Sequence, residues 1–249
     1  MAWQGVEIEI EVPCAGGQKH PVRLRFTGWG AFEVAYNPCE ELLGPVFARM
    51  AACTHYLHEK FPKAFRNDTD LKWRLVEAFG AAGAPAVPAL IQALGDSGWS
   101  VRRAAAEALG KLGDRQAVPA LIRALGDSDR DVRAAAAEAL GKLGNPQAIP
   151  ALIKALRDGS YDVRRAAAEA LVKIGTPAVP ALIQALRDSY SSVRAAACEV
   201  MGTIGDAQAV PALTKALGDL SFKVQGAARN AIEQIEARQS CRGQQQSAP

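Results

Sequence analysis

A short sequence unit returns five times along this chain and constrains its fold more than any other feature. The tripeptide Pro-Ala-Leu recurs every 30 or 31 residues, and an aspartate follows each proline by eight residues. The prolines are Pro88, Pro119, Pro150, Pro180 and Pro211, and the aspartates are Asp96, Asp127, Asp158, Asp188 and Asp219. Self-similarity at such a period is the signature of a fold built from stacked repeats.

Each unit predicts two short helices, which we name A and B. In the first unit, helix A begins near Pro88, because a proline in the first turn of a helix loses no hydrogen bond. Helix B spans 101–112, carries an apolar stripe from Val101 to Leu112, and ends at Gly113. Neither helix is long enough to be stable alone in water, so neighbouring repeats must cover its apolar face. The predicted fold class is all-α, a right-handed α-solenoid of helix pairs.

The composition changes at both ends of this array. Residues 71–83 match helix B of the repeat and predict a degenerate first unit, so the array is expected over 71–237. Alternating apolar and charged residues predict strands at 6–12 and 21–29, and a helical pattern covers 39–61. Residues 1–70 are therefore expected to form a β-hairpin and helix cap on the array. The polar residues 238–249 predict a disordered tail.

The repeated pattern D-x-x-x-x-V-R-x-A-A-A-x-A-L-G resembles the HEAT-like repeats of phycobilin lyases and related proteins. The resemblance covers about residues 71–236 and implies a solenoid in which the recurring aspartates pair with arginines of neighbouring repeats. Those arginines are Arg102, Arg133, Arg164 and Arg194. The family includes subunits that attach bilins to phycobiliproteins and proteins that only bind other proteins. The related deoxyhypusine hydroxylase uses His-Glu pairs, and the array contains no histidine, which excludes that reaction.

The residues that differ between repeats are the candidates for binding. The B helices are expected to line a concave surface, where small Ala and Gly side chains would let a partner helix approach closely. The exceptions on this surface are Trp73, Arg103, Arg165, Val172 and Cys198. A second row, on the loops between helices A and B, comprises Trp99, Arg130, Tyr161, Tyr190 and Phe222. Aromatic and arginine side chains are enriched at protein interfaces.

Each of these residues also has a structural interpretation. Arg103 and Arg165 lie four residues before a glutamate, at the spacing of a helical ion pair. The loop aromatics would pack against the next loop, Trp73 would be covered by the N-terminal cap, and Cys198 would be an inert replacement of alanine.

Three hypotheses for function follow. The leading one is a protein-binding scaffold or adaptor without enzymatic activity, because no nucleophile, base and oxyanion donor are assembled. The second is a phycobilin lyase or lyase-associated chaperone, which the resemblance implies, with Arg103 and Arg165 pairing with bilin propionates. The third is a metallocofactor carrier or assembly factor. Its ligands would come from Cys14, Cys39, Cys53, His55 and His58, although no Cys-x-x-Cys or His-Glu-x-x-His is present. No resident cofactor or metal is predicted.

Charge and hydropathy narrow the class of partner. The net charge of +3 is spread without a basic stripe, which disfavours nucleic acid. No run of about 18 apolar residues and no signal peptide are present, so we expect a cytoplasmic protein with no membrane partner. Five scattered cysteines, an odd number, are typical of free thiols in a reducing compartment. The expected partner is another protein, either a helical segment or a phycobiliprotein.

Overall fold

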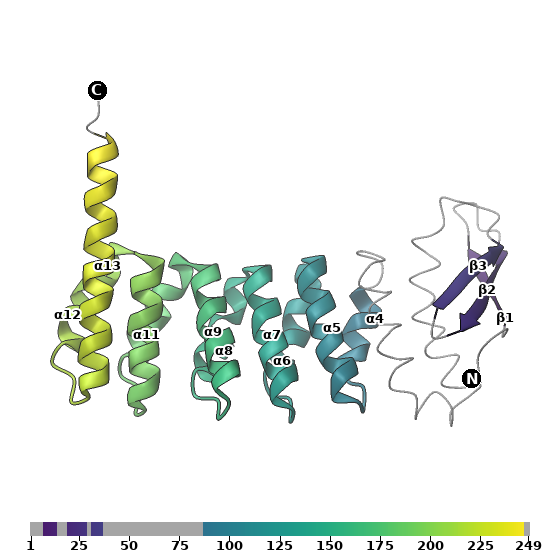
Figure 1. Cartoon of the computed structure of the whole chain (residues 1–249), viewed down its shortest axis with the longest axis horizontal. Coiled ribbons are helices and arrows are strands. Elements are labelled where there is room, and N and C mark those ends of the chain that lie inside the picture. The colour runs from purple at the N-terminus through teal and green to yellow at the C-terminus, as the bar shows by residue number, and fades with distance from the viewer. Residues whose placement is uncertain (1–6, 14–18, 29–30, 37–86, 247–249) are drawn as a thin grey trace. The chain divides into compact units, whose positions relative to one another are not determined.

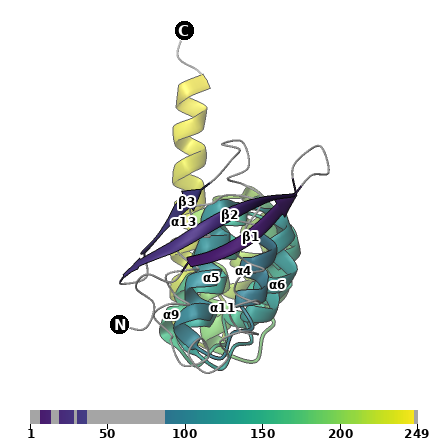
Figure 2. The ribbon, with the colours of Figure 1, turned by 90° about the vertical axis from the view of Figure 1, so that its right-hand side faces the viewer.

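The computed structural model describes residues 7–13, 19–28, 31–36 and 87–246. The chain divides into two compact units, residues 1–114 and 115–249. In the first unit, three antiparallel strands pair in sequence order, β1 (Glu7–Pro13), β2 (Lys19–Gly28) and β3 (Ala31–Tyr36) (Figure 2). The first two strands match those predicted from the alternating pattern, and β3 completes the sheet. The first unit also contains the helix pair α4 (Val87–Ala93) and α5 (Trp99–Leu112).

The second unit contains four further helix pairs at the predicted positions. The A helices are α6 (Val118–Ala124), α8 (Ile149–Ala155), α10 (Val179–Ala185) and α12 (Val210–Ala216). The B helices are α7 (Arg130–Leu143), α9 (Tyr161–Ile174), α11 (Ser191–Ile204) and α13 (Phe222–Gln246). Short 3₁₀ turns lead into the A helices at Arg115–Ala117, Pro146–Ala148, Thr176–Ala178 and Ala207–Ala209.

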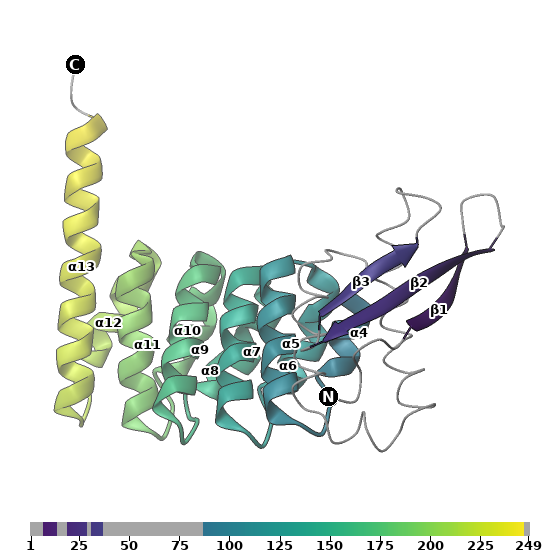
Figure 3. The same ribbon diagram turned by 45° about the vertical axis from the view of Figure 1, so that its right-hand side comes forward.

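The helices of the second unit form two layers (Figures 1 and 3). Each A helix packs on the B helix that follows it, and the B helices stand side by side in chain order. The largest fully buried side chains here are Leu121, Leu140, Leu152, Leu156, Leu171, Leu182, Met201, Leu213 and Ile235. Since each repeat supplies leucines to a core shared with its neighbours, the fold is the α-solenoid of helix pairs that the period predicted.

The C-terminal end of the chain differs from the prediction. The polar composition predicted a disordered tail from residue 238, whereas α13 continues as a helix to Gln246. Extending a helix that is already formed needs no new nucleation, and Gln and Arg are good helix formers. Arg238 also anchors this extension by donating a hydrogen bond to the carbonyl of Thr203, at the end of α11.

Several predicted features lie outside the described residues. They are the helix at 39–61, the degenerate repeat at 71–83 with Trp73, and the group Cys14, Cys39, Cys53, His55 and His58. Within the described part of the chain, no single helix has the length and hydropathy to cross a membrane. The segments Tyr161–Ile174 and Thr176–Ala185 pass that test only when taken together across a 115° bend.

The recurring aspartates form ion pairs between repeats, as the resemblance implied. Arg133 binds both carboxylate oxygens of Asp158, at 2.7 and 3.0 Å, and Arg194 binds Asp219 in the same way, at 2.7 and 2.8 Å. Each aspartate also accepts a hydrogen bond from the backbone N–H two residues later, which fixes its own loop. In α13, Gln225 replaces this arginine and keeps only the local hydrogen bond to the carbonyl of Asp219.

Acidification is expected to destabilise the stack through these aspartates. Burial alone would raise the pKa of Asp158, but Arg133 and the Ser160 N–H hold it below its usual value. The pKa of Asp219 is lowered chiefly by its hydrogen bond to Arg194. A carboxyl group whose pKa is lower in the folded state stabilises it above the unfolded pKa of about 4. This contribution is lost as pH falls through the folded pKa.

The melting temperature should therefore fall between pH 5 and pH 3, and the fall should be smaller in D219N than in the wild type. An equal fall in D219N, measured by circular dichroism, would show that this ion pair is not the source of the acid sensitivity.

Candidate functional site

Most of the small residues expected to floor a partner groove instead lie between neighbouring B helices. A Cβ atom at Gly141 would lie 2.8 Å from Cα of Ala170 on the next B helix, and one at Gly202 would lie 2.7 Å from Cα of Ala231. Ala137 lies five residues after Val132, the valine of the repeat pattern in α7, and is fully buried. The expectation of a groove floored by Ala and Gly is therefore wrong at these positions. Small side chains are needed here because the chain's own helices approach so closely.

Cys198 lies at the same kind of contact between B helices, and its expected place on the binding surface is also wrong. Its side chain is fully buried, so it does not face a partner as the sequence analysis expected. Burial, with smaller contributions from the charges of Asp219 and Glu199, raises the pKa of its thiol to about 12. A thiol with so high a pKa is protonated and unreactive at neutral pH.

Thiol titration tests this burial. With Ellman's reagent at pH 8, native wild-type protein and native C198A should show the same number of rapidly reacting thiols. In denaturant, the wild type should show one thiol more than C198A. A rapidly reacting thiol that C198A lacks in the native state would contradict the buried position.

The contact between α9 and α11 differs from the other B-helix contacts of the second unit. Val172 stands where α7 and α11 carry Gly141 and Gly202, and the repeat register places Val200 opposite it, where α9 and α13 carry alanine. Two larger side chains hold these helices apart, and α9 lies farther from α11 than from α7. Val172 is in consequence half-buried rather than enclosed. We call this wider contact the α9/α11 seam.

The connection between these two repeats differs as well. It is one residue shorter than the others, since Pro150 and Pro180 are 30 residues apart. Gly175 there has φ 79° and ψ −144°, outside the left-handed helical conformation of Gly144 and Gly205. The ladder implied by the resemblance is altered here, because Asp188 accepts its side-chain hydrogen bonds from Arg157, which is not one of the recurring arginines, and a further one from the Tyr190 N–H. Arg164 retains its hydrogen bonds to the carbonyls of Asp158 and Gly159.

The exposed face of α9 carries the predicted arginine. Tyr161, Arg165 and Glu169 lie at i, i+4 and i+8 and so share one face of the helix. Arg165 donates a 2.7 Å hydrogen bond to Glu169, and both side chains are about half exposed. This bond raises the pKa of Arg165. In α5 of the first unit, Arg103 lies 3.5 Å from Glu107 and 5.7 Å from the ring centre of Trp99, so the same arrangement is repeated there.

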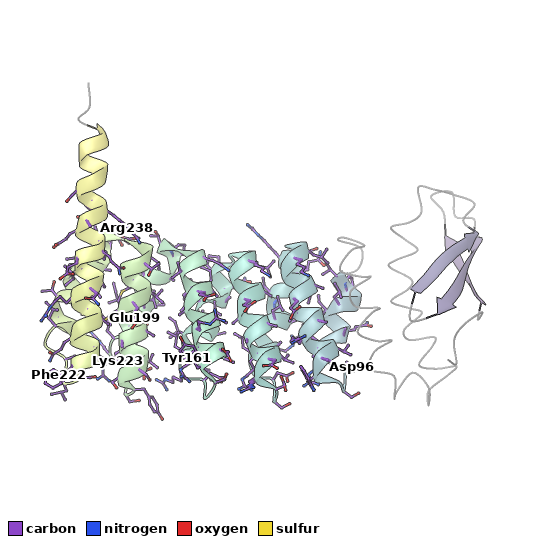
Figure 4. All side chains as sticks on the ribbon, in the orientation of Figure 1. Asp96, Tyr161, Glu199, Phe222, Lys223 and Arg238 are labelled. Atoms are coloured by element: carbon purple, nitrogen blue, oxygen red, sulfur yellow. The ribbon has the colours of Figure 1, made fainter. Side chains whose placement is uncertain are left out.

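The loop aromatics are exposed rather than packed into the next loop. Tyr161 is 67% exposed and Phe222 is 86% exposed, and Trp99 and Tyr190 are exposed as well. Within the second unit, Figure 4 shows Tyr161 and Phe222 at the same edge of the helical layers, where the B helices begin. Arg164 and Arg157 lie 5.8 and 5.5 Å from the ring centres of Tyr161 and Tyr190, which limits the rotation of these two rings.

The sequence analysis missed two features near the last helix pair. Leu220 is 99% exposed and stands where the other repeats of the second unit have Ser or Gly. A groove of about 200 Å³ lies between α11 and α13, and Glu199 and Lys223 line its two sides (Figure 4). The other lining residues are Thr203, Ala227, Asn230, Ala231 and Gln234. The departure of Leu220 from the repeat pattern was a usable signal, whereas the groove depends on helix spacing.

Across the described residues, no three His, Cys, Asp or Glu side chains are grouped so that they could hold a metal ion.

Comparisons with known proteins found similar sequences among solved structures. The chain is similar to a chain in the complex of CpcE and CpcF of phycocyanin lyase from Nostoc sp., with 34% identity and a TM-score of 0.45, covering 65% of this chain and 70% of that one. It is also similar to a designed armadillo repeat protein in complex with the peptide (KR)4, with 20% identity, a TM-score of 0.45, and 76% and 99% coverage. Human deoxyhypusine hydroxylase in complex with glycerol has 18% identity and a TM-score of 0.36, with 79% and 99% coverage. No curated protein has a matching sequence.

The sequence profile of HEAT repeats matches residues 63–139, 118–189 and 179–242. These matches overlap and span most of the 249 residues. They start before Val87, so the profile match includes the stretch 71–83 that the repeat pattern singled out. The chain therefore belongs to the HEAT-repeat family.

Proposed function

We propose that this protein is a scaffold or adaptor that binds another protein through the exposed face of its B helices, centred on α9 and the α9/α11 seam. The observation that carries the proposal is the set of side chains on α9. Tyr161, Arg165 and half-buried Val172 depart from the repeat pattern and are accessible together on one helix. Tyrosine and arginine are among the residues that dominate binding energy at interfaces, and Val172 adds apolar area beside them.

The scaffold beneath these residues is suited to binding without rearrangement. The ion pairs of Asp158 and Asp219 and the close contacts at Gly141 and Gly202 hold the B helices at fixed spacing. Tyr161 is further held by Arg164. Binding of a partner would therefore cost little conformational entropy, because these side chains and helices are already ordered.

The repeats themselves supply the test variants. At the positions equivalent to Tyr161 and Arg165, α11 carries Ser191 and Ala195. The double variant Y161S/R165A should therefore fold normally, while removing the aromatic and guanidinium groups. The matched control is K154E/Q184E, which changes exposed residues of the A helices α8 and α10.

We expect proteins captured by the wild type from native lysate to be captured equally by K154E/Q184E, and at least about tenfold less by Y161S/R165A. Circular dichroism provides the folding control. Equal capture by all three proteins would reject the B-helix face as the binding surface.

The second candidate function is a phycobilin lyase or lyase-associated chaperone. It is supported by the resemblance of the repeat unit and by the exposure of Arg165 and Arg103, whose guanidinium groups would pair with bilin propionates. Under this hypothesis, phycocyanobilin added to the protein should change its absorption spectrum, and R165A should reduce the change. An unchanged spectrum with and without an apo-phycobiliprotein would reject the lyase hypothesis and leave the scaffold proposal intact.

A further inference from the structure

A second apolar surface lies at the connection between α12 and α13. Leu217, Leu220 and Phe222 fall within six residues and are all exposed, Leu220 almost completely. We call these three residues the terminal patch. The equivalent leucine is buried in one other repeat of the second unit, at Leu156, and half-buried in two, at Leu125 and Leu186. Contiguous exposed apolar side chains in a folded protein mark interaction sites.

The charges around the terminal patch are positive. Lys215 and Lys223 flank it in the sequence, and both are exposed. The nearby Asp219 is already neutralised, because both of its carboxylate oxygens bind Arg194. Glu199 lines the groove beside Lys223, but among the described residues no ion pair of 4 Å or less joins the two. The two lysines are thus available to an acidic ligand.

We propose that the terminal patch docks an acidic amphipathic helix of a partner protein. The apolar side of that helix would cover Leu217, Leu220 and Phe222, and its carboxylates would face Lys215 and Lys223. An amphipathic helix matches both features of the patch, because one of its faces is apolar and the opposite face can carry carboxylates. A second copy of this chain fits less well, since a two-fold contact places identical residues together and brings the lysines near one another.

The test uses the full chain and three fluorescein-labelled 18-residue peptides. The first has Leu and Phe at i, i+3, i+4 and i+7 spacing with Glu and Asp elsewhere. The second replaces every acidic residue with Lys, and the third is a scrambled acidic sequence of the same composition. The test variant is L220S/F222S, which introduces the serines found at Ser189 and Ser191 in the preceding repeat. The matched control is Y190S, which replaces another exposed aromatic side chain with the serine found at Ser160 and Ser221 in the neighbouring repeats.

Fluorescence anisotropy should show that the acidic amphipathic peptide binds at least about tenfold more tightly than the other two. L220S/F222S should weaken this binding by a similar factor, Y190S should leave it unchanged, and K215A/K223A should weaken it and remove most of its salt dependence. Because these side chains are exposed, all variants should keep the wild-type melting curve.

Four results would overturn the proposal: no binding of the acidic peptide, equal or tighter binding of the basic peptide, equal binding by L220S/F222S, or a concentration-dependent dimer that L220S/F222S abolishes. The last result would assign the patch to a second copy. Because the terminal patch and the α9 face are tested by different variants, failure of either proposal leaves the other unaffected.

Discussion

Replacing Gly141 with valine is expected to lower the free energy of unfolding by about 3 kcal/mol. The added Cβ would lie 2.8 Å from Cα of Ala170 and 2.9 Å from Cβ of Ala170. Ala170 belongs to α9, so the clash can be relieved only if that helix moves away. The α7–α9 spacing, and with it the core shared by both repeats, would have to open. Urea denaturation followed by circular dichroism measures the loss.

Gly226 in α13 is the matched control for this substitution. It is also a helical glycine, but no atom lies within 4 Å of the place where a Cβ would stand. G226A should therefore raise the free energy of unfolding by about 0.5–1 kcal/mol, because alanine restricts the unfolded chain and favours helix. If G141V and G226A had similar effects, close packing of the B helices would not explain the glycine of the repeat.

Removing the carboxylate of Asp158 is expected to cost about 3 kcal/mol of stability. The side chain is 14% exposed and accepts two hydrogen bonds from Arg133 and one from the Ser160 N–H. D158A therefore leaves a largely buried guanidinium without its charge partner and releases the loop before α9. Because Asp158 joins two repeats, the loss should also make the denaturation transition less cooperative.

Glu169 provides the comparison, since it also binds an arginine at 2.7 Å but is 48% exposed. Water solvates both partners of that pair, so E169A should change stability by less than about 0.5 kcal/mol. Equal losses in D158A and E169A would mean that the interrepeat position of Asp158 adds nothing to stability.

The helix pairs could be predicted from the sequence because their signals are local. A proline in the first turn starts each A helix of the second unit, and glycine with positive φ follows α5, α7, α9 and α11. The ion pairs of Asp158 and Asp219 followed from the family resemblance. The exposure of Tyr161 and Phe222 did not follow from the resemblance, because the repeat pattern equally allowed these aromatic side chains to pack against the next loop.

The packing between helices could not be predicted in the same way. Helical periodicity shows which face a residue lies on, but it does not give the distance to the next helix. Ala137 and Cys198 were therefore placed on an open groove, although the neighbouring helix covers them. The pairing of Asp188 with Arg157 was missed because Arg157 is not one of the recurring arginines, and its reach to the next repeat depends on the spacing of the helices.

Side-chain footprinting of the captured complex tests the central claim most directly. Hydroxyl radicals modify exposed aromatic side chains, so the protein is oxidised alone and with its partner bound, and the modified peptides are quantified by mass spectrometry. The account predicts that binding protects Tyr161 and the exposed face of α9, while the A helices α8 and α10 are oxidised equally in both samples. Protection confined to the A helices, with Tyr161 oxidised equally in the free and bound protein, would contradict it.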